Sequence, residues 1–155
     1  MLEKIEIIKI CEVREEIVAE LCKIHNENFD KKVESKYFEE ILSNTQYTVY
    51  YIRRLEKVSG YIIYYDTFDS FDLFEIAIEK EFQNKGLGNE LLGKTIDRMF
   101  GEEKYKSREK TVFLEVDENN FGAVKLYKKN NFKEISLRKN YYGIGQNAII
   151  MVRNL

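Results

Sequence analysis

Apolar positions along the chain follow strand and helix periods in a regular order. Stretches rich in Ile, Val, Tyr and Phe predict strands at residues 4–10, 46–54, 61–65, 73–78, 111–116, 132–137 and 147–153. Apolar residues at helical spacing predict helices at residues 12–28, 35–42, 87–100 and 120–130. This alternation predicts an α/β fold, a sandwich in which a mixed sheet carries helices on both faces.

Local signals add detail to these elements. We expect Ser35 to cap the second helix, residues 57–60 to turn the chain, and residues 138–146 to form a loop. Asn119 or Asn120 is expected to cap the last helix, and Asn130-Asn131 to end it, since asparagine tolerates the left-handed conformation. The tyrosine-rich hairpin is expected to pack in a sheet with one face partly exposed, rather than to form a base-stacking platform.

Length and composition limit the classes of protein that fit. At 155 residues, with 44% hydrophobic and 34% charged residues, the chain is expected to be one globular domain over residues 1–155. A net charge of −2 argues against a broad nucleic-acid-binding face. We expect no membrane span and no secretory leader, because no apolar run is long enough. Cys11 and Cys22 match neither a zinc spacing nor a redox motif, so we expect no metal and a reducing cytoplasm.

Two glycines lie at the turn between the predicted strand at 73–78 and the helix that follows. The sequence there is Gln83-Asn84-Lys85-Gly86-Leu87-Gly88. Glycine lets the backbone approach a bulky ligand, and a helix start offers unpaired N–H groups and a positive dipole end to an anion. The turn is therefore a candidate pyrophosphate cradle, to which Lys85 adds a positive charge.

The pattern at this turn is QxxGxG after a strand. We do not expect a nucleoside-triphosphate loop here, and the dinucleotide pattern GxGxxG fails because Leu91 stands where its third glycine belongs. The alternative is a glycine-containing turn that only joins a strand to a helix.

Two further residues carry groups suited to acid–base chemistry. Glu115 lies within the apolar strand TVFLEV, either on a solvated face or in a cleft, where loss of hydration would favour a base. Tyr127 lies on the next helix, and its phenol either packs or donates a proton to a leaving thiolate. The single histidine, His25, near the end of the first helix, suits a favourable dipole interaction without a catalytic role.

From residue 73 to about residue 151 the chain resembles the bacterial ribosomal-protein-alanine N-acetyltransferases of the GNAT superfamily. The resembling segments are LFEIAI, EFQNKGLGNELL, IDRMF, FLEVDENNFGAVKLYKKNNF, LRKNYY and NAIIM. The resemblance implies a GNAT fold, whose mostly antiparallel sheet contains a central parallel strand pair that splays apart to admit acetyl-coenzyme A. It also implies direct acetyl transfer to an amine, with the oxyanion held by strand N–H groups.

The resemblance also implies roles for individual residues. Glu115 would be the proton acceptor and Tyr127 the proton donor to the coenzyme A thiolate. The cofactor would be bound by strand backbone groups of Ile76, Ala77 and Ile78, by backbone N–H groups of Asn84, Lys85, Gly86, Leu87, Gly88 and Asn89, and by Asn120.

The chain departs from this branch mainly on the acceptor side. The branch usually carries a Phe-Pro-Trp loop after the first helix, where this chain has Asn28-Phe29-Asp30-Lys31. A protein N-terminal α-amine is the expected acceptor. A small-molecule amine, a lysine, or a non-catalytic acyl-coenzyme A-binding module are the alternatives. We expect no nucleic-acid or membrane partner, and either a monomer or a dimer.

Overall fold

The computed structural model describes residues 4–154 and contains the predicted elements in the predicted order. The strands are β1 (Ile5–Lys9), β2 (Tyr47–Arg54), β3 (Lys57–Asp66), β4 (Phe71–Ile78), β5 (Thr111–Asp117), β6 (Lys133–Gly143) and β7 (Gln146–Asn154). The helices are α1 (Glu15–Asn28), α2 (Ser35–Ser43), α3 (Leu87–Phe100) and α4 (Phe121–Lys129), with short 3₁₀ turns at Lys80–Phe82 and Glu103–Tyr105. The expectation of no leader concerns residues 1–3 in part, and these lie outside the described residues.

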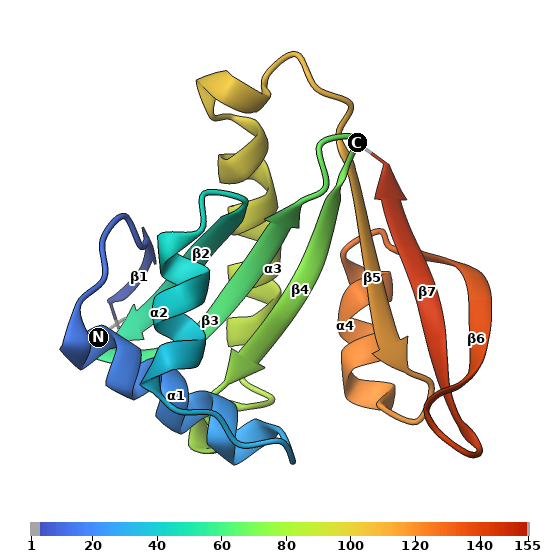
Figure 1. Cartoon of the computed structure of the whole chain (residues 1–155), viewed down its shortest axis with the longest axis horizontal. Coiled ribbons are helices and arrows are strands. Elements are labelled where there is room, and N and C mark those ends of the chain that lie inside the picture. Colours follow the sequence, from blue (N-terminus) through green and yellow to red (C-terminus); the bar gives the residue numbers. More distant parts are fainter. Residues whose placement is uncertain (1–3, 155) are drawn as a thin grey trace.

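The strands form one mixed sheet in the order β1-β2-β3-β4-β5-β7-β6 (Figure 1). Every neighbouring pair is antiparallel except β4 and β5, which run parallel. The predicted mixed sheet with a central parallel pair is therefore confirmed.

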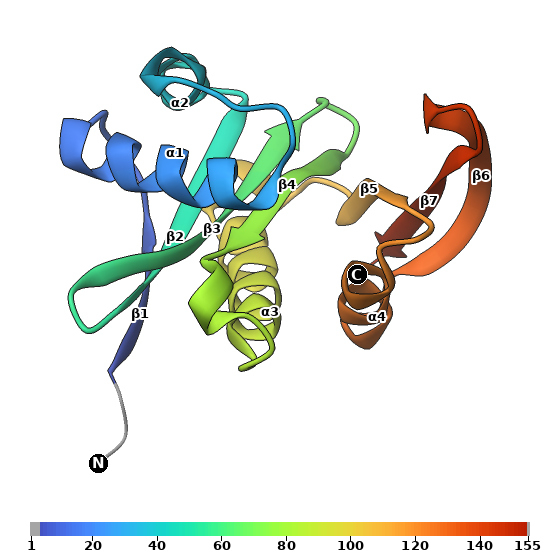
Figure 2. The same ribbon diagram turned by 90° about the horizontal axis from the view of Figure 1, so that it is seen from below.

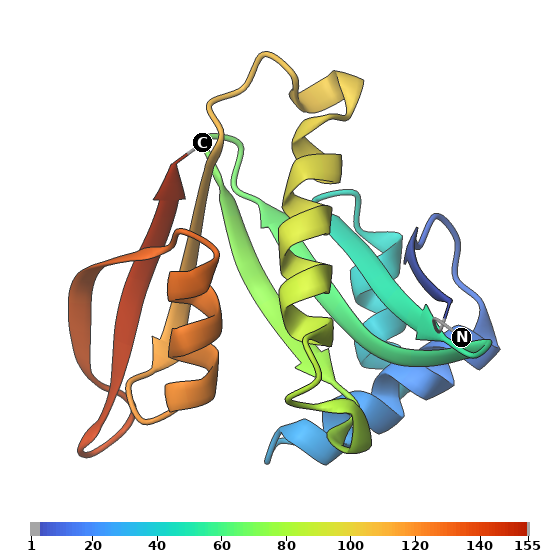
Figure 3. The ribbon, with the colours of Figure 1, turned by 180° about the vertical axis from the view of Figure 1, so that it is seen from behind.

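Helices cover both faces of this sheet (Figure 2). Helices α1 and α2 lie on one face, and α3 and α4 lie side by side on the other (Figures 2 and 3). Alternating side chains of β3 supply both cores: Ile62 and Tyr64 pack on the α3 side, while Tyr61 and Ile63 pack on the α1 side. All four are fully buried, so the expectation that one face of the tyrosine-rich hairpin is partly exposed is wrong.

Three predicted boundaries are wrong for identifiable reasons. The turn expected at residues 57–60 lies at Leu55 and Glu56, which both adopt positive φ without a glycine to signal it. Strand β6 continues to Gly143, so most of the loop expected at 138–146 is strand. Its residues are nearly all exposed, and exposure removes the apolar period that marks a strand. Helix α2 begins at Ser35 itself, and its N-cap position is Glu34.

Candidate functional site

The parallel strands β4 and β5 separate almost as soon as they meet. They pair only through Phe71 with Val112 and Asp72 with Phe113, and we call these two pairs the seam. Beyond the seam the strands diverge (Figures 1 and 3). Residues 73–78 of β4 therefore keep an edge that no other strand covers.

Backbone alternation decides which groups of β4 face this open edge. The Glu79 N–H donates to the Ser59 carbonyl at 2.9 Å, and Ala77 lies opposite Tyr61. Because alternate residues of a strand turn their backbone groups to opposite sides, Ile76 and Ile78 direct theirs toward the open edge, while Ala77 bonds β3. The Ile78 carbonyl already accepts hydrogen bonds from the Asn28 and Gln83 side-chain amides, both at 3.0 Å.

The glycine loop, residues 83–88, lies between β4 and α3. Gly86 adopts φ 85° as the N-cap residue of α3, and Asn84 is also left-handed at φ 62°. Within the described residues 4–154, none of the backbone N–H groups of residues 84–89 donates to a protein acceptor. Residues 84–86 are exposed. The loop therefore offers a group of unsatisfied donors at the positive end of a helix, which suits a phosphate.

Behind the glycine loop, Gly88 packs close to side chains of α4 and β4. A Cβ on Gly88 would lie 3.4 Å from a methyl of Leu126 on α4 and 3.8 Å from Ile78. The Asn130 side-chain amide at the end of α4 donates to the Asn89 side-chain oxygen at 3.0 Å. The start of α3 is thus held against both β4 and α4.

A second glycine pattern in α3 has no such properties. Residues 88–95, GNELLGKT, spell the nucleoside-triphosphate pattern GxxxxGK[ST]. They lie entirely inside α3, so from Leu91 onward their N–H groups belong to the helix and form no loop around a phosphate. The pattern therefore occurs without the structure that gives it its function.

Glu115 lies on β5, on the face of the sheet that carries α1 and α2. Its neighbours Leu114 and Val116 are buried in the α3-side core, so its own side chain points the opposite way. The Arg138 guanidinium donates to the Glu115 carboxylate at 2.6 Å, and the Glu115 side chain is 31% exposed. Burial and then the Glu115 carboxylate raise the pKa of Asp72, and burial chiefly raises the pKa of Tyr142 to about 12.

Tyr127 lies on the other side of the sheet from Glu115. Its ring is buried in the α3-side core, 5.9 Å from the ring of Phe132 between centroids. Burial raises the pKa of Tyr127, so its phenol keeps its proton at neutral pH. Within residues 4–154 the hydroxyl has no hydrogen-bond partner. Asn120 caps α4, as expected, by accepting the Ala123 N–H at 3.2 Å.

Sequence reasoning missed a buried polar network around Glu75, on the splayed part of β4. Tyr61 and Tyr37 donate to its carboxylate at 2.6 and 3.1 Å, and His25 Nδ1 lies 3.2 Å away. His25 also bonds the Lys31 carbonyl at 3.0 Å and is only 5% exposed. His25 is therefore held by side chains of other elements, which its position in the sequence does not signal.

Two other features are not found in residues 4–154, a metal-binding cluster and a membrane-spanning helix. No group of three or more His, Cys, Asp or Glu side chains is arranged to hold a metal ion. No helix in that part of the chain has the length and apolarity needed to cross a membrane.

Comparison with known proteins gives a consistent set of relatives. Residues 15–132 match the family model described as Acetyltransferase (GNAT) family. An N-alpha-acetyltransferase of Sulfolobus acidocaldarius is 37% identical over 83 residues, covering 54% of this chain and 47% of the relative. The [ribosomal protein bS18]-alanine N-acetyltransferase of Escherichia coli K12 is 35% identical over 98 residues, covering 61% of this chain and 63% of the relative. The matches thus span about half to two thirds of these relatives.

The fold has solved counterparts. The crystal structure of the ribosomal-protein-S18-alanine N-acetyltransferase from Escherichia coli superposes with a TM-score of 0.81 and 24% sequence identity. That superposition covers 97% of this chain and 94% of the other.

Proposed function

Because the chain belongs to the GNAT family of acetyltransferases, we propose that it transfers an acetyl group from acetyl-coenzyme A directly to the N-terminal α-amine of a protein. One observation carries the proposal. Two parallel strands separate after two residue pairs, beside a helix start whose N–H groups from residue 84 to residue 89 lack acceptors among residues 4–154. The gap between the separating strands can hold the extended pantetheine arm of acetyl-coenzyme A. The free N–H groups at the helix start can bind its pyrophosphate.

The residues present fit this cofactor. The N–H groups of Asn84, Lys85, Gly86, Leu87, Gly88 and Asn89 are available to phosphate oxygens. The backbone groups of Ile76 and Ile78 at the open edge of β4 can form strand-like hydrogen bonds with the amides of the pantetheine arm. Bound there, the cofactor supplies a thioester, which activates the acetyl group toward an amine.

The proposed acid and base lie on opposite faces of the sheet. Glu115, on the α1 and α2 side, would accept the proton of the amine, and Arg138 holds its carboxylate in place at 2.6 Å. Tyr127, on the α3 and α4 side, would donate a proton to the departing thiolate, and burial keeps its phenol protonated at neutral pH. This separation suits a direct transfer in which acceptor and cofactor approach from opposite sides.

Energetics favour an α-amine as the acceptor. Removing a proton at pH 7 costs about 1 kcal/mol for an α-amine of pKa about 8 and about 4.6 kcal/mol for a lysine of pKa about 10.4. One exposed glutamate, Glu115, suits the deprotonation of an α-amine better than that of a lysine. The names of the two sequence relatives also describe N-terminal acetyltransferases.

A small cationic amine is the second candidate acceptor. Asp72 of β4 and Glu115 of β5 lie on the same face of the sheet. They are close enough that the Glu115 charge contributes to the raised pKa of Asp72. Two neighbouring carboxylates attract an ammonium group of any origin. This chain lacks the Phe-Pro-Trp sequence after α1 that is usual in the ribosomal-protein-alanine branch. A ribosomal protein is therefore proposed as one acceptor among protein N-termini.

We further propose a cytoplasmic location and one domain over residues 1–155. The two cysteines within the described residues are both free thiols, in keeping with a reducing compartment. A bacterial source rests on the resemblance to the bacterial branch, and a relative from the archaeon Sulfolobus acidocaldarius matches at similar identity.

The test is an acceptor panel with thiol release as the readout. The protein is mixed with acetyl-coenzyme A and with peptides that begin with Ala or Ser, the same peptides with a blocked N-terminus, and free amines. We expect turnover with the unblocked peptides alone. Turnover with free amines but not peptides selects the small-amine acceptor, and tight cofactor binding without turnover selects a non-catalytic module.

Variants of one carboxylate make the panel specific for the mechanism. Glu115→Gln should lower kcat/KM by about 10²- to 10⁴-fold, the usual contribution of a general base, with unchanged cofactor affinity. Glu134→Gln is the matched control, because Glu134 is an exposed strand carboxylate that pairs with Lys128. Equal activities of the two variants would remove Glu115 from the proposed mechanism.

A further inference from the structure

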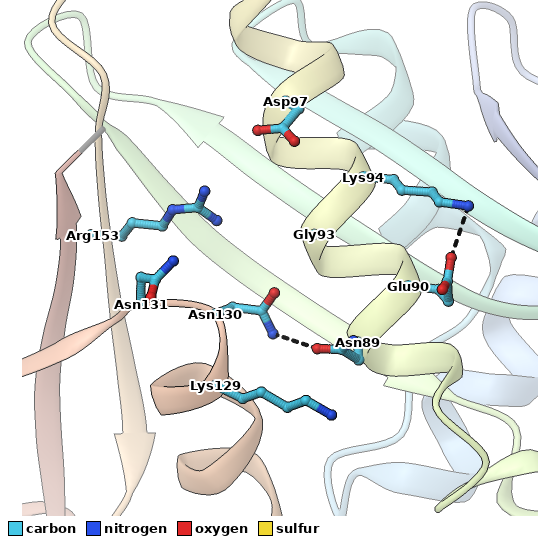
Figure 4. Close-up of a pocket in the computed structure, with 9 residues that line it drawn as sticks. All are labelled: Asn89, Glu90, Gly93, Lys94, Asp97, Lys129, Asn130, Asn131 and Arg153. Atoms are coloured by element: carbon cyan, nitrogen blue, oxygen red, sulfur yellow. Dashed lines mark hydrogen bonds and ion pairs between the residues drawn. The ribbon is translucent and has the colours of Figure 1, made fainter.

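A cleft of about 320 Å³ lies on the α3 and α4 side of the sheet and extends from Asn89, just after the glycine loop, along α3 (Figure 4). We call it the Arg153 cleft. Its floor is at Gly93, where a Cβ would lie 3.4 Å from the Asn130 side-chain oxygen. The cleft is lined by Asn89, Glu90, Gly93, Lys94, Asp97, Lys129, Asn130, Asn131 and Arg153.

Arg153 lies at a position of β7 where the alternation of the strand predicts an apolar side chain. Ile149, Met151 and Arg153 are alternate residues of β7, and the first two pack in the α3-side core. The Arg153 side chain points from β7 toward α3 into the cleft (Figure 4). The pattern of β7 thus places a guanidinium at the edge of a hydrophobic core.

The Arg153 side chain is largely buried, and its Nε–H has no hydrogen-bond partner within residues 4–154. The residue is 9% exposed, and its Nε is a buried donor without a hydrogen bond. No carboxylate of residues 4–154 forms an ion pair with Arg153, although Asp97 lines the same cleft. A buried charge without a partner is costly, so a group that satisfies its donors would be bound favourably.

The charges around the cleft favour an anion. Lys94 is paired with Glu90 at 2.8 Å, and Figure 4 shows both side chains directed away from Arg153. Lys129, Arg153 and the exposed Asp97 also line the cleft, which leaves one unbalanced positive charge in its lining, although the Lys129 ammonium points away from Asp97 (Figure 4). The Asn131 side-chain amide beside Arg153 adds a neutral donor (Figure 4).

We propose that the Arg153 cleft binds a small oxyanion, a carboxylate or a phosphate, whose oxygens accept hydrogen bonds from the Arg153 guanidinium. The guanidinium is planar and offers parallel N–H donors that match both groups. The site is independent of the proposed acetyl transfer. The cleft adjoins the glycine loop at Asn89, whose side chain accepts a hydrogen bond from Asn130.

The experiment titrates anions into the full chain saturated with coenzyme A, which occupies the proposed cradle at the glycine loop. Inorganic phosphate and acetate are added separately at constant ionic strength, and the Arg153 Nε–H resonance is followed by NMR. We expect a saturable shift of that resonance. Phosphate saturating at lower concentration assigns a phosphate ligand, and acetate doing so assigns a carboxylate.

Variants identify the residues that bind the anion. Arg153→Gln should weaken binding by about tenfold or more, since a charge-assisted pair is lost. If that variant fails to fold, Lys129→Ala still tests the site, because Lys129 is exposed and its replacement should not affect folding. This variant should weaken anion binding by about threefold, because one surface charge is lost. Lys128→Ala, a neighbouring cation that does not line the cleft, should leave binding unchanged.

Three results would overturn the proposal. The first is the absence of a saturable shift with either anion. The second is binding in the free protein that disappears with coenzyme A, which would assign the cleft to the cofactor site. The third is equal weakening by Lys128→Ala and Lys129→Ala, which would mean non-specific attraction to α4.

Discussion

Asp72 of β4 and Glu115 of β5 bring two carboxylates to the same face of the sheet, the first in the seam and the second just beyond it. Neither has a sequence neighbour that predicts the other, because they lie on strands separated by α3. Burial, followed by the Glu115 charge, raises the pKa of Asp72 above its ordinary value. The ionised form of Asp72 is therefore less favourable in the folded protein than in the unfolded chain.

The sign of this shift gives a pH-dependent prediction for stability. With a raised folded pKa, ionised Asp72 destabilises the fold above that pKa, and the cost vanishes below the unfolded pKa of about 3.9. Asp72→Asn should therefore raise Tm at pH 7, and the gain should disappear as the pH falls below about 4. Thermal unfolding at several pH values measures this. Asp69→Asn, in the exposed loop before β4, is the control, and a gain independent of pH would contradict the explanation.

Individual residues also show where sequence reasoning stops. Asn120 and Asn131 were predictable, because capping and left-handed helix ends are local properties. The pairing of Arg138 with Glu115 joins residues 23 apart, and His25 meets Glu75 over 50 residues. Such contacts depend on strand order, which no local pattern encodes.

At the scale of elements, β3 and β4 pack tightly against each other at Gly60. A Cβ there would lie 2.5 Å from Ile78 Cδ1 and 2.9 Å from the Ala77 carbonyl oxygen. The first atom is the end of a flexible side chain, but the second belongs to the backbone of β4. Gly60 thus sets the position of the strand that is proposed to bind the cofactor arm.

Gly60→Ala should disturb both stability and cofactor binding. We expect a loss of about 1–3 kcal/mol in the free energy of unfolding, as for other overpacked sites, and a higher KM for acetyl-coenzyme A. Denaturant unfolding and steady-state kinetics measure the two effects. Gly122→Ala in α4 is the matched control, since no heavy atom lies within 4 Å of its Cβ, and it should stabilise the helix by up to about 1 kcal/mol. An unchanged KM in Gly60→Ala would mean that β4 does not contact the cofactor.

Elements with one buried face were predicted well, and β6 was not. Strand β5 was expected at residues 111–116 and observed at Thr111–Asp117, because its apolar side chains are buried. Strand β6 packs against β7 with exposed side chains over most of its length, so its register comes from pairing rather than from a hydrophobic pattern. The Arg153 cleft escaped prediction for a related reason, since an arginine near the end of an apolar strand resembles an ordinary solvated terminus.

At the scale of the whole molecule, the sheet consists of two parts joined at the seam. Strands β1–β4 form one part and β5, β6 and β7 the other, with two residue pairs between them. The α3-side core spans both parts, including Leu92 of α3, Met151 of β7 and Tyr127 of α4. Packing across this core, rather than strand pairing, therefore holds the two parts together.

A ligand that contacts both parts should stabilise the folded chain as a whole. At 100 times its Kd, acetyl-coenzyme A should add about 2.7 kcal/mol and raise Tm by roughly 5–10 °C for a chain of this size. Differential scanning fluorimetry measures the shift, and hydrogen exchange locates it. We expect slower exchange at residues 84–89 and unchanged exchange in β1. A stabilised protein whose residues 84–89 still exchange freely would place the ligand elsewhere.

The glycine loop meets its proposed ligand through main-chain amides. Every residue type except proline carries such an amide, so most amino-acid replacements at these positions preserve the donors as long as the backbone keeps its course. Substitutions at this turn can therefore change the side chains while the main-chain phosphate-binding groups are kept. The left-handed residues at its bend, Asn84 and Gly86, and the small Gly88 against α4 are the positions where replacement is most restricted.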